Sequence, residues 1–297
     1  WRLSQLEGSD GFIFWRINFC DVHNFSSLIT KALDSIGVLD GVIHLGGRAG
    51  IRQSVSNPLD YYESNVLGTL NVLEFCHAHG IKKFVFASSS SLYSGIGEMP
   101  FSESVNTDRP ISPYAASKKA AEELCFSYHY LYGMDITVFR FFSVYGPAGR
   151  PDMSPFRFIQ SVIEGVPLTF FGNGTQQRDF TYIDDIVEGV LRCCDKPATA
   201  NPDFDPLQPD PATAAAPHRV FNIGNSQPTE LLRFIEVMEQ ALGRDAIKDF
   251  QPMQPGDVVA TAADTKALED WVGFRPSTAI EAGVAKFAEW YRDFYGV

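Results

Sequence analysis

A tyrosine and a lysine four residues apart are the residues of this chain best suited to moving a proton. Tyr114 and Lys118 follow a run of four serines at residues 88–91. A phenol, whose pKa is ordinarily about 10, is a poor base at neutral pH, but an ammonium one helical turn away lowers that pKa toward the working range. A serine hydroxyl that faces the same substrate oxygen completes a proton relay. These residue types predict acid–base chemistry at a substrate hydroxyl.

The order of the surrounding segments gives this spacing its weight. A tyrosine and a lysine at this spacing are alone a weak signal, and a serine run is usually a loop. Here the serines end an apolar run at residues 84–87, which is typical of a buried parallel strand, and open α/β sheets place their sites at such strand ends. Ser112 and Pro113 are suited to begin a helix, on which Tyr114 and Lys118 share one face.

Composition limits the classes of protein and partner. The chain has 297 residues, of which 45% are apolar and 20% are charged, and this suits one large or two unequal globular domains. A net charge of −12 argues against nucleic acid or an anionic membrane as partner, so an anionic substrate would need local arginines. Five cysteines show no metal-binding spacing, which favours the reducing cytoplasm, and we expect no signal peptide or membrane span.

Strands and helices alternate along the first half of the chain. We expect strands at residues 12–16, 41–45, 84–87 and 136–142, with helices at 25–36, 59–78 and 114–132 between them. This alternation predicts an α/β fold with a doubly wound parallel sheet. We assign residues 1–150 to this domain, which also receives a strand and a helix from about 180–225.

The periodicity changes in the second half, and residues 151–297 are expected to form a smaller α/β region that binds the substrate. Residues 195–217 are rich in Pro, Ala and Asp and predict a surface insertion with little regular structure. The other expected elements are a strand at 168–171, a helix ending at 193, a strand at 219–223, and helices at 229–242 and 279–291.

A sheet of this kind usually binds a dinucleotide through Gly-x-Gly-x-x-Gly at its first strand–helix turn, and this fingerprint is missing. Gly95 and Gly97 lack the third glycine, and Gly46 and Gly47 belong to a run with the wrong spacing. Either the fold binds no dinucleotide, or the first strand and helix are absent from this chain. We favour the second interpretation, because the sequence begins in the middle of a repeating pattern.

Several motifs resemble those of the extended short-chain dehydrogenase/reductase family, and in particular the nucleotide-sugar epimerases of its UDP-glucuronate 4-epimerase branch. The Arg-Pro-Asp-Met stretch at residues 150–153 is the most specific of them. The motifs extend over nearly the whole chain, at residues 44–52, 88–93, 114–118, 140–147, 149–153, 178–185 and 255–258.

The resemblance implies a Rossmann-like domain that binds NAD, with its first unit missing, and a set of site residues. Tyr114 would be the catalytic base, Lys118 would lower its pKa and bind the nicotinamide ribose, and Ser89 would be the active-site hydroxyl, with Ser88, Ser90 and Ser91 as register alternatives. Cofactor contacts would come from Asn18, Phe19, Gly46, Gly47 and Asn65, together with Tyr114 and Lys118. Substrate contacts would come from Ser90, Ser143 (sugar), Arg150 (carboxylate), Arg178 (diphosphate) and Asp257 (uridine ribose).

Several positions depart from the family pattern, including Ser94, which follows Tyr93 where glycine is usual. Asn18 stands where Asp is usual, Gly46 and Gly47 replace two alanines, and Ser143 replaces a threonine but keeps the hydroxyl. Some assignments also have ordinary structural alternatives: Arg150 could be a solvated loop residue, and Arg178 could form an ion pair with Asp179, Asp184 or Asp185. His44, on a buried strand, is more typical of a core histidine than of a catalyst.

The implied activity is NAD-dependent 4-epimerisation of UDP-glucuronate to UDP-galacturonate, through transient oxidation at C4 and return of the hydride to the opposite face. Related dehydratases need an Asp-Glu pair after the active-site hydroxyl, whereas this chain has Ser90 and Ser91. A UDP-hexose 4-epimerase, another nucleotide-sugar epimerase or dehydratase, and an inactive sugar-nucleotide-binding fragment remain alternatives. Relatives commonly dimerise through the helices expected at 59–78 and 114–132, so we expect a homodimer.

Overall fold

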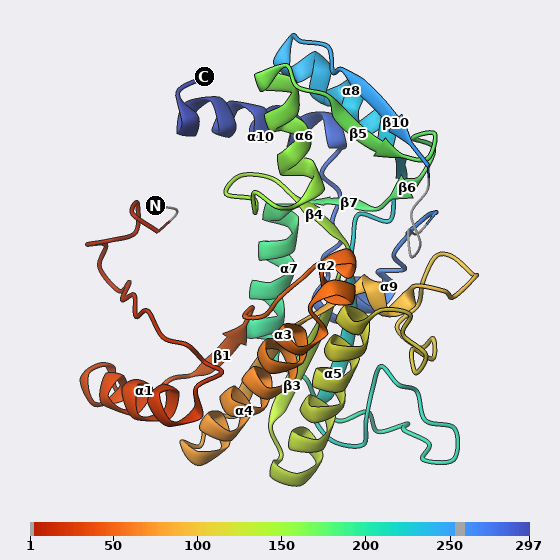
Figure 1. The fold of residues 1–297 in the computed structure, drawn as a ribbon. Helices are drawn as coiled ribbons and strands as arrows, with labels where there is room; N and C mark the ends of the chain where they lie inside the picture. The colour runs from red at the N-terminus through yellow and green to blue at the C-terminus, as the bar shows by residue number, and fades with distance from the viewer. Residues whose placement is uncertain (1–2, 253–258) are drawn as a thin grey trace.

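Four parallel strands form the central sheet of the protein, for which a computed structural model describes residues 3–252 and 259–297 (Figure 1). The strands run in the order β1 (Gly41–His44), β2 (Lys83–Ser89), β3 (Asp135–Phe141) and β8 (His218–Ile223). Both faces of β2 are buried, which explains its nearly continuous apolar sequence. The predicted doubly wound parallel sheet is confirmed.

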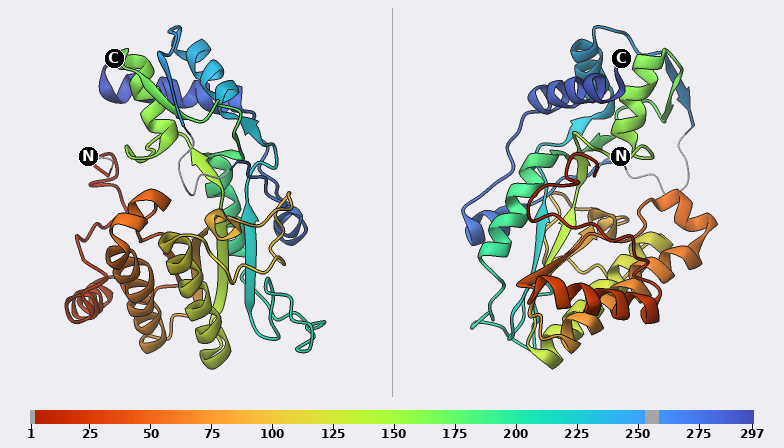
Figure 2. Two further views of the ribbon diagram at one scale, coloured as in Figure 1. Left: turned by 45° about the vertical axis from the view of Figure 1, so that its right-hand side comes forward. Right: turned by 90° about the vertical axis from the view of Figure 1, so that its left-hand side faces the viewer.

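Helices cover both faces of this sheet, as Figure 2 shows. On one face, α1 (Val22–Ile36), α4 (Gly68–Ala78) and α5 (Pro113–Tyr132) share a hydrophobic core with the strands. On the other face, α7 (Ile183–Asp195) and α9 (Lys266–Val272) pack against a second core. The carboxyl ends of the strands therefore remain as the open edge at which side chains can meet.

The helix expected at residues 59–78 has an irregular centre. It consists of α3 (Pro58–Tyr62), a π-helical turn η1 (Glu63–Leu67) and α4, and it follows a short α2 (Ile51–Ser56). Gly68 starts α4 directly against the Phe19 ring, since a Cβ at Gly68 would lie 2.3 Å from that ring. π turns occur mostly as single turns within helices and often at functional sites.

The second half of the chain builds a separate hydrophobic cluster above the open edge (Figures 1 and 2). Phe180 and Phe234 stack at its centre with ring centroids 3.9 Å apart. Most of its side chains come from α6 (Ser154–Glu164), β5 (Leu168–Phe171), α8 (Leu231–Leu242) and α10 (Ile280–Tyr295), and β10 (Lys248–Gln251) pairs with β5. The domain division near residue 150 stays a prediction.

Short elements join the two parts. Strand β4 (Ser143–Tyr145) pairs with β7 (Phe180–Tyr182), and β6 (Gln177–Arg178) pairs with β9 (Thr229–Glu230). A 3₁₀ turn, η2 (Ser90–Tyr93), continues the chain after β2. These pairings hold the segment that follows β3 over the end of the sheet.

Two expectations from the sequence need correction. The strand predicted at residues 12–16 does not form, and Ile13, Phe14 and Trp15 are exposed. An apolar run needs a neighbouring strand to complete its backbone hydrogen bonds, and this one has none among the described residues. The insertion at 195–217 contains no helix or strand beyond Asp195, the last residue of α7, as expected, but its Ala198, Ala212 and Ala214 are buried.

No helix in the described part of the chain has the length and apolar character that crossing a bilayer requires.

Candidate active site

The first turns of α5 present Tyr114 and Lys118 to the end of β2. The Ser112 hydroxyl accepts a hydrogen bond from the Ala115 N–H at 3.2 Å, and Pro113 occupies the first turn. These caps fix where the helix begins and therefore which residues face the sheet. Tyr114 and Lys118 are both buried on that face. The predicted helix start and shared face are confirmed.

The Tyr114 phenol lies in an environment with opposing effects on its ionisation. Burial raises the pKa of Tyr114 overall, and a hydrogen bond from the Ser89 hydroxyl and the positive charge of Arg150 offset only part of that rise. The Tyr61 ring packs edge-on against the phenol ring, with centroids 6.0 Å apart. The donor and the cation thus favour the phenolate that a base would need, against the larger opposing effect of burial.

Lys118 is anchored to the strand that carries the serines. Its Nζ donates to the Ala87 carbonyl oxygen at 2.7 Å and lies 4.9 Å from the centroid of the Phe86 ring. Burial lowers the pKa of Lys118 to about 8, against the opposing negative charge of Glu122. An effect of Lys118 on the pKa of Tyr114 stays a prediction.

The side chains of the four serines at residues 88–91 point to different neighbours, so they can be told apart as candidates for the active-site hydroxyl. Ser89 bonds to Tyr114, whereas the Ser88 hydroxyl donates to Glu122 on the buried side of α5. Ser90 and Ser91 lie in η2 and line a cleft. Of the four hydroxyls, that of Ser89 is the one placed at the phenol.

A glycine turn follows β1 and wraps around Asn65 of the π turn. The Asn65 side chain accepts from the Arg48 N–H at 2.7 Å and donates to the Arg48 carbonyl at 3.0 Å and to the Ser117 hydroxyl at 2.9 Å. Gly47 has φ +141°, and a Cβ there would lie 2.6 Å from the Asn65 amide oxygen and 3.4 Å from Lys118 Nζ. Only glycine therefore leaves this backbone accessible beside Lys118.

This turn fits the expected approach of a flat cofactor ring system. Gly47 is exposed, and Lys118 and Asn65 border it. The Phe19 ring lies edge-on to His44 at 5.5 Å, and a Cβ on Gly46 would be 3.0 Å from it. Of the residues expected around NAD, Phe19, Gly46, Gly47, Asn65 and Lys118 therefore lie together at the end of β1.

Asn18 and His44 each have a hydrogen-bond partner within the protein. The Asn18 side chain accepts from the Cys20 N–H at 3.1 Å in a local turn. His44 Nε2 is 3.1 Å from the Thr69 hydroxyl, and burial together with the charge of Lys118 lowers the pKa of His44 to about 4. His44 is thus a neutral core histidine, as its position on a buried strand suggested.

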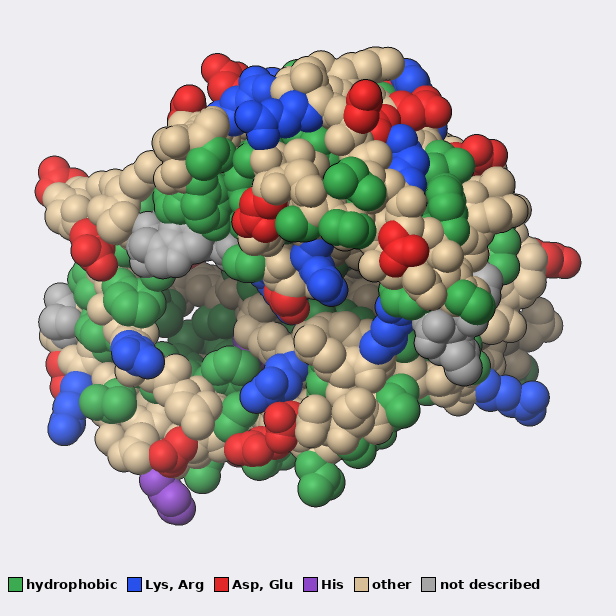
Figure 3. Space-filling model, turned by 45° about the horizontal axis from the view of Figure 1, so that its top comes forward, with side chains coloured by type: hydrophobic (Ala, Val, Ile, Leu, Met, Phe, Trp, Pro, Cys, Tyr) green, Lys and Arg blue, Asp and Glu red, His purple; other side chains and the backbone are tan. Residues whose placement is uncertain are grey.

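A cleft of about 710 Å³ lies between the open edge of the sheet and the second hydrophobic cluster. Figure 3 shows this face hollowed, with Lys and Arg side chains at the edges of the hollow. Among the predicted substrate residues, Ser90, Ser143 and Arg178 line the cleft. Arg52 and Arg157 also line it and were not predicted. An acidic protein thus carries the local cationic lining that an anionic substrate requires.

Of the two arginines that the sequence did not predict in the cleft, Arg52 lies in a recognisable motif and Arg157 does not. Arg52 ends the motif at residues 44–52, and its guanidinium lies 4.1 Å from the centroid of the Phe171 ring. That contact joins α2 to a strand far along the chain, which no local pattern reveals. Arg157 lies within α6, where a polar residue on an amphipathic helix has no distinguishing mark.

The predicted substrate arginines have partners in the protein. The Arg150 guanidinium donates to both carboxylate oxygens of Asp152, with Nε 3.0 Å from Oδ1, and Asp152 lines the cleft. Arg178 donates to the carbonyls of Gln177 at 2.8 Å and Val259 at 3.4 Å.

Two of the three carboxylates expected as possible ion-pair partners of Arg178 bond to backbone groups. Asp179 accepts from the N–H groups of Asn225, Ser226 and Ala263, and Asp185 accepts from those of Ser277 and Thr278. Asp257 lies outside the described residues, so its predicted contact stays a prediction.

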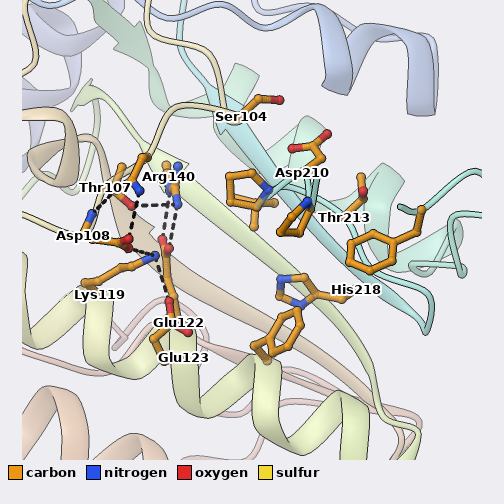
Figure 4. A pocket seen from close by; sticks show the side chains of 16 residues that line it. Ser104, Thr107, Asp108, Lys119, Glu122, Glu123, Arg140, Asp210, Thr213 and His218 are labelled. Carbon is orange, nitrogen blue, oxygen red and sulfur yellow. Dashed lines mark hydrogen bonds and ion pairs between the residues drawn. The ribbon is translucent and has the colours of Figure 1, made fainter. Parts of the chain in front are cut away.

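A second cavity of about 400 Å³ opens on the far side of α5, beneath the insertion (Figure 4). Glu122 and Arg140 line it, and the sequence analysis assigned a role to neither. Their ionic groups bond to each other, with Arg140 Nη2 2.8 Å from a Glu122 oxygen.

Comparisons with known proteins agree on one family. A model of the NAD dependent epimerase/dehydratase family matches residues 3–224. A UDP-glucuronate 4-epimerase of Thermodesulfobacterium geofontis is 41% identical over 294 residues, which cover 99% of this chain and 83% of that protein. A probable UDP-glucuronate 4-epimerase of Rhizobium meliloti is 44% identical over 86% of this chain and 75% of that protein.

A solved structure shows the same likeness in three dimensions. The UDP-glucuronic acid 4-epimerase from Bacillus cereus, in complex with UDP-glucuronic acid and NAD, superposes with a TM-score of 0.82 at 30% identity. The match covers 99% of this chain and 85% of that one.

Lys118 gives a prediction for the pH dependence of stability. Burial lowers its pKa to about 8 in the folded protein, from an ordinary value of 10.5. A base whose pKa falls on folding destabilises the folded state while it is charged, and this penalty is relieved as the pH rises from 8 to 10.5. We therefore expect the Tm of Lys118→Met minus the Tm of wild type, measured by thermal unfolding, to be larger at pH 7 than at about pH 10.

The control is Lys119→Met, which removes an ammonium that pairs with Glu123 at 2.8 Å on the outer side of the same helix. A Tm difference between K118M and wild type that stays constant or becomes more favourable toward pH 10 would contradict the expectation.

Proposed function

This chain belongs to the NAD dependent epimerase/dehydratase family, and from this premise we propose that it interconverts UDP-glucuronate and UDP-galacturonate by epimerisation at C4. The meeting of Tyr114, Ser89 and Lys118 beside a glycine turn and an arginine-lined cleft carries the proposal. Relatives with this activity match 99% of the chain. A UDP-hexose 4-epimerase is the second candidate.

The cofactor is NAD, and the residues around the glycine turn are suited to hold it. Gly46 and Gly47 would let it approach the backbone, Lys118 would donate to its ribose, and Asn65 would hold the turn in shape. When bound, NAD supplies the reversible hydride acceptance that oxidises C4 of the sugar.

Tyr114 and its neighbours handle the proton of the sugar hydroxyl. The Tyr114 Oη would take the proton of the 4-hydroxyl while C4 is oxidised, and would return it when C4 is reduced. The hydrogen bond from Ser89 and the positive charge of Arg150 favour the phenolate that this step needs. Burial of the phenol keeps bulk water away from the proton transfer.

The residues after Ser89 favour epimerisation over loss of water. Elimination needs an acid placed to protonate the departing hydroxyl. Ser90 and Ser91 are the residues that reach the cleft from η2, and neither is a carboxylic acid. The keto sugar can therefore turn within the cleft and be reduced on its other face.

Arg150 is proposed as the residue that binds the sugar carboxylate. The positive charge of Arg150 lowers the pKa of the Tyr114 phenol, which supports this assignment. Asp152 holds it there through two hydrogen bonds. A substrate carboxylate held by this cation is restrained from aligning with the C4 ketone, the alignment that would release CO2. Arg52, Arg157 and Arg178 are suited to the diphosphate.

The phenol oxygen provides the direct test of the proposed function. We expect Tyr114→Phe to lower the kcat for UDP-glucuronate by about 100- to 10,000-fold, because the proton acceptor is removed while the ring packing remains. Chromatographic separation of the two UDP-uronates measures the conversion. Tyr132→Phe, at the far end of α5, is the matched control and should retain activity. Full activity in Y114F, or wild-type protein that converts no nucleotide sugar, would refute the proposal.

Arg150 separates the two candidate substrates. We expect Arg150→Met to lower kcat/KM for UDP-glucuronate by about 10- to 100-fold, which is the loss of one charge-assisted contact, and to change that for UDP-glucose far less. Both sugars are assayed with wild type and variant. Equal losses for both sugars, or a wild type that prefers UDP-glucose, would favour the hexose epimerase.

We also propose a homodimer that forms through the helices beside the sheet. Apolar side chains are exposed on both helices, with Phe126, Tyr130 and Leu131 on α5 and Leu59 and Tyr62 on α3. Tyr130→Glu places a charge on this surface and should give a monomer in light scattering, whereas Tyr295→Glu on α10 should not. A Y130E variant of unchanged mass would contradict this interface.

The proposed location is the cytoplasm. All five cysteines are free, which suits a reducing compartment.

A further inference from the structure

A row of polar side chains crosses three strands directly beside the site. Ser88, Arg140 and Asn222 are in register on β2, β3 and β8, one residue before the level of Ser89. In-register residues of a parallel sheet point to the same face, so this row projects toward α5. All three side chains are buried, and Arg140 is only 1% exposed.

Glu122 of α5 forms an ion pair with Arg140 of this row (Figure 4). Arg140 donates from Nε to one Glu122 oxygen at 3.0 Å and from Nη2 to the other at 2.8 Å. Arg140 Nη1 also donates to the Tyr93 hydroxyl at 2.9 Å, and Tyr93 donates to Asn222 at 2.7 Å. Every hydrogen-bonding direction of this cation is thus defined by neighbours.

The same carboxylate ties helix α5 to the end of β2. Ser88 donates its hydroxyl proton to Glu122 Oε1 at 2.5 Å, and Lys118 donates to the Ala87 carbonyl at 2.7 Å. These two contacts lie on consecutive residues of the strand and one helical turn apart on the helix. The next strand residue is Ser89, and the preceding helical turn carries Tyr114. The relative position of these two side chains therefore depends on both contacts.

We propose that Glu122, oriented by Arg140, is a positioning residue for the epimerase reaction: it aligns Ser89 with Tyr114 through Ser88 and supplies the negative charge that keeps Lys118 an ammonium. This inference rests on the proposed function. Glu122 touches neither the cleft nor the phenol, so it acts through Ser88 and Lys118.

Glu122 acts on Lys118 among several other charged and titratable groups. Those that face Glu122 are Arg140 from β3, His218 from β8, Tyr93 from η2 and Lys119 from α5. Those that face Lys118 are Cys125 and Glu122 from α5 and His44 from β1. Burial lowers the pKa of His218 to about 3, so it stays neutral in the working range, and Arg140 stays charged. Burial raises the pKa of the Cys125 thiol well above its ordinary value, so this thiol stays neutral. Glu122 is therefore the anion whose removal should alter the ionisation of Lys118.

The first test removes the charge and keeps the shape. Glu122→Gln should move the alkaline limb of the pH profile of kcat to lower pH, because Lys118 then loses its proton more readily. Glu123→Gln, at the adjacent position paired with Lys119, should leave the limb in place. A purely structural role predicts an equal loss of kcat at every pH, and that result in a folded E122Q protein would overturn the proposal.

The second test leaves the buried ion pair intact and covers the case in which E122Q does not fold. Ser88→Ala should lower kcat about tenfold with KM within about twofold, and Ser88→Thr should recover most of the loss. Ser127→Ala, at an exposed hydroxyl of the same helix, is the control. Unchanged kcat in S88A would overturn the proposal.

A binding measurement separates this proposal from the function on which it rests. Wild-type activity on UDP-glucuronate tests the function alone. The affinity for NAD is titrated by fluorescence from pH 6 to about 10. As the pH rises, this affinity should begin to fall at a lower pH in E122Q than in wild type, even if no sugar is converted. Identical profiles for the two proteins would refute the role of Glu122 directly.

Discussion

The contact between the end of β2 and the first turns of α5 is the constraint on which the site depends. Tyr114 and Lys118 come from the helix and Ser89 comes from the strand, so their alignment is set by how these elements are held together. The buried pair of Glu122 and Arg140 sits at this contact. Removing one partner of such a pair typically costs about 3–5 kcal/mol, because the other charge is left buried alone. The stability of the folded protein thus depends on this pair, and the alignment of Tyr114, Lys118 and Ser89 depends on the fold.

The distribution of charge shows how an acidic protein can accept a highly anionic substrate. The whole chain carries a net charge of −12, which disfavours the approach of a uridine diphosphate sugar at long range. Arg52, Arg157 and Arg178 nevertheless line one cleft. Charges at contact distance in a partly desolvated cleft outweigh remote ones, which solvent and salt screen within about 8–10 Å. Affinity here is therefore a local property of the cleft.

The sequence predicted the parts of the site that local rules determine. Helical periodicity placed Tyr114 and Lys118 on one face, and Ser112 and Pro113 fixed the start of α5. Adjacent strand residues point to opposite sides, so the sequence alone could not choose among the four serines. The pair of Glu122 with Arg140 and the contact of Arg52 with Phe171 require knowledge of which elements are neighbours. The strand expected at residues 12–16 failed because an apolar run does not supply its own partner strand.

The π turn at Glu63–Leu67 shows how an irregular backbone can be the feature that a site preserves. A π turn accommodates one residue more than a regular helical turn does, and here that segment carries Asn65. Deleting a single residue would let α3 and α4 join as one continuous α-helix with better backbone geometry. The same deletion would rotate α3 relative to α4 about the helix axis by about 100°, because each residue of a 3.6-residue turn accounts for that angle. Asn65 could then no longer keep its hydrogen bonds to Arg48 and Ser117 while α4 keeps its packing, so a regular helix and the observed glycine turn are alternatives at this point in the chain.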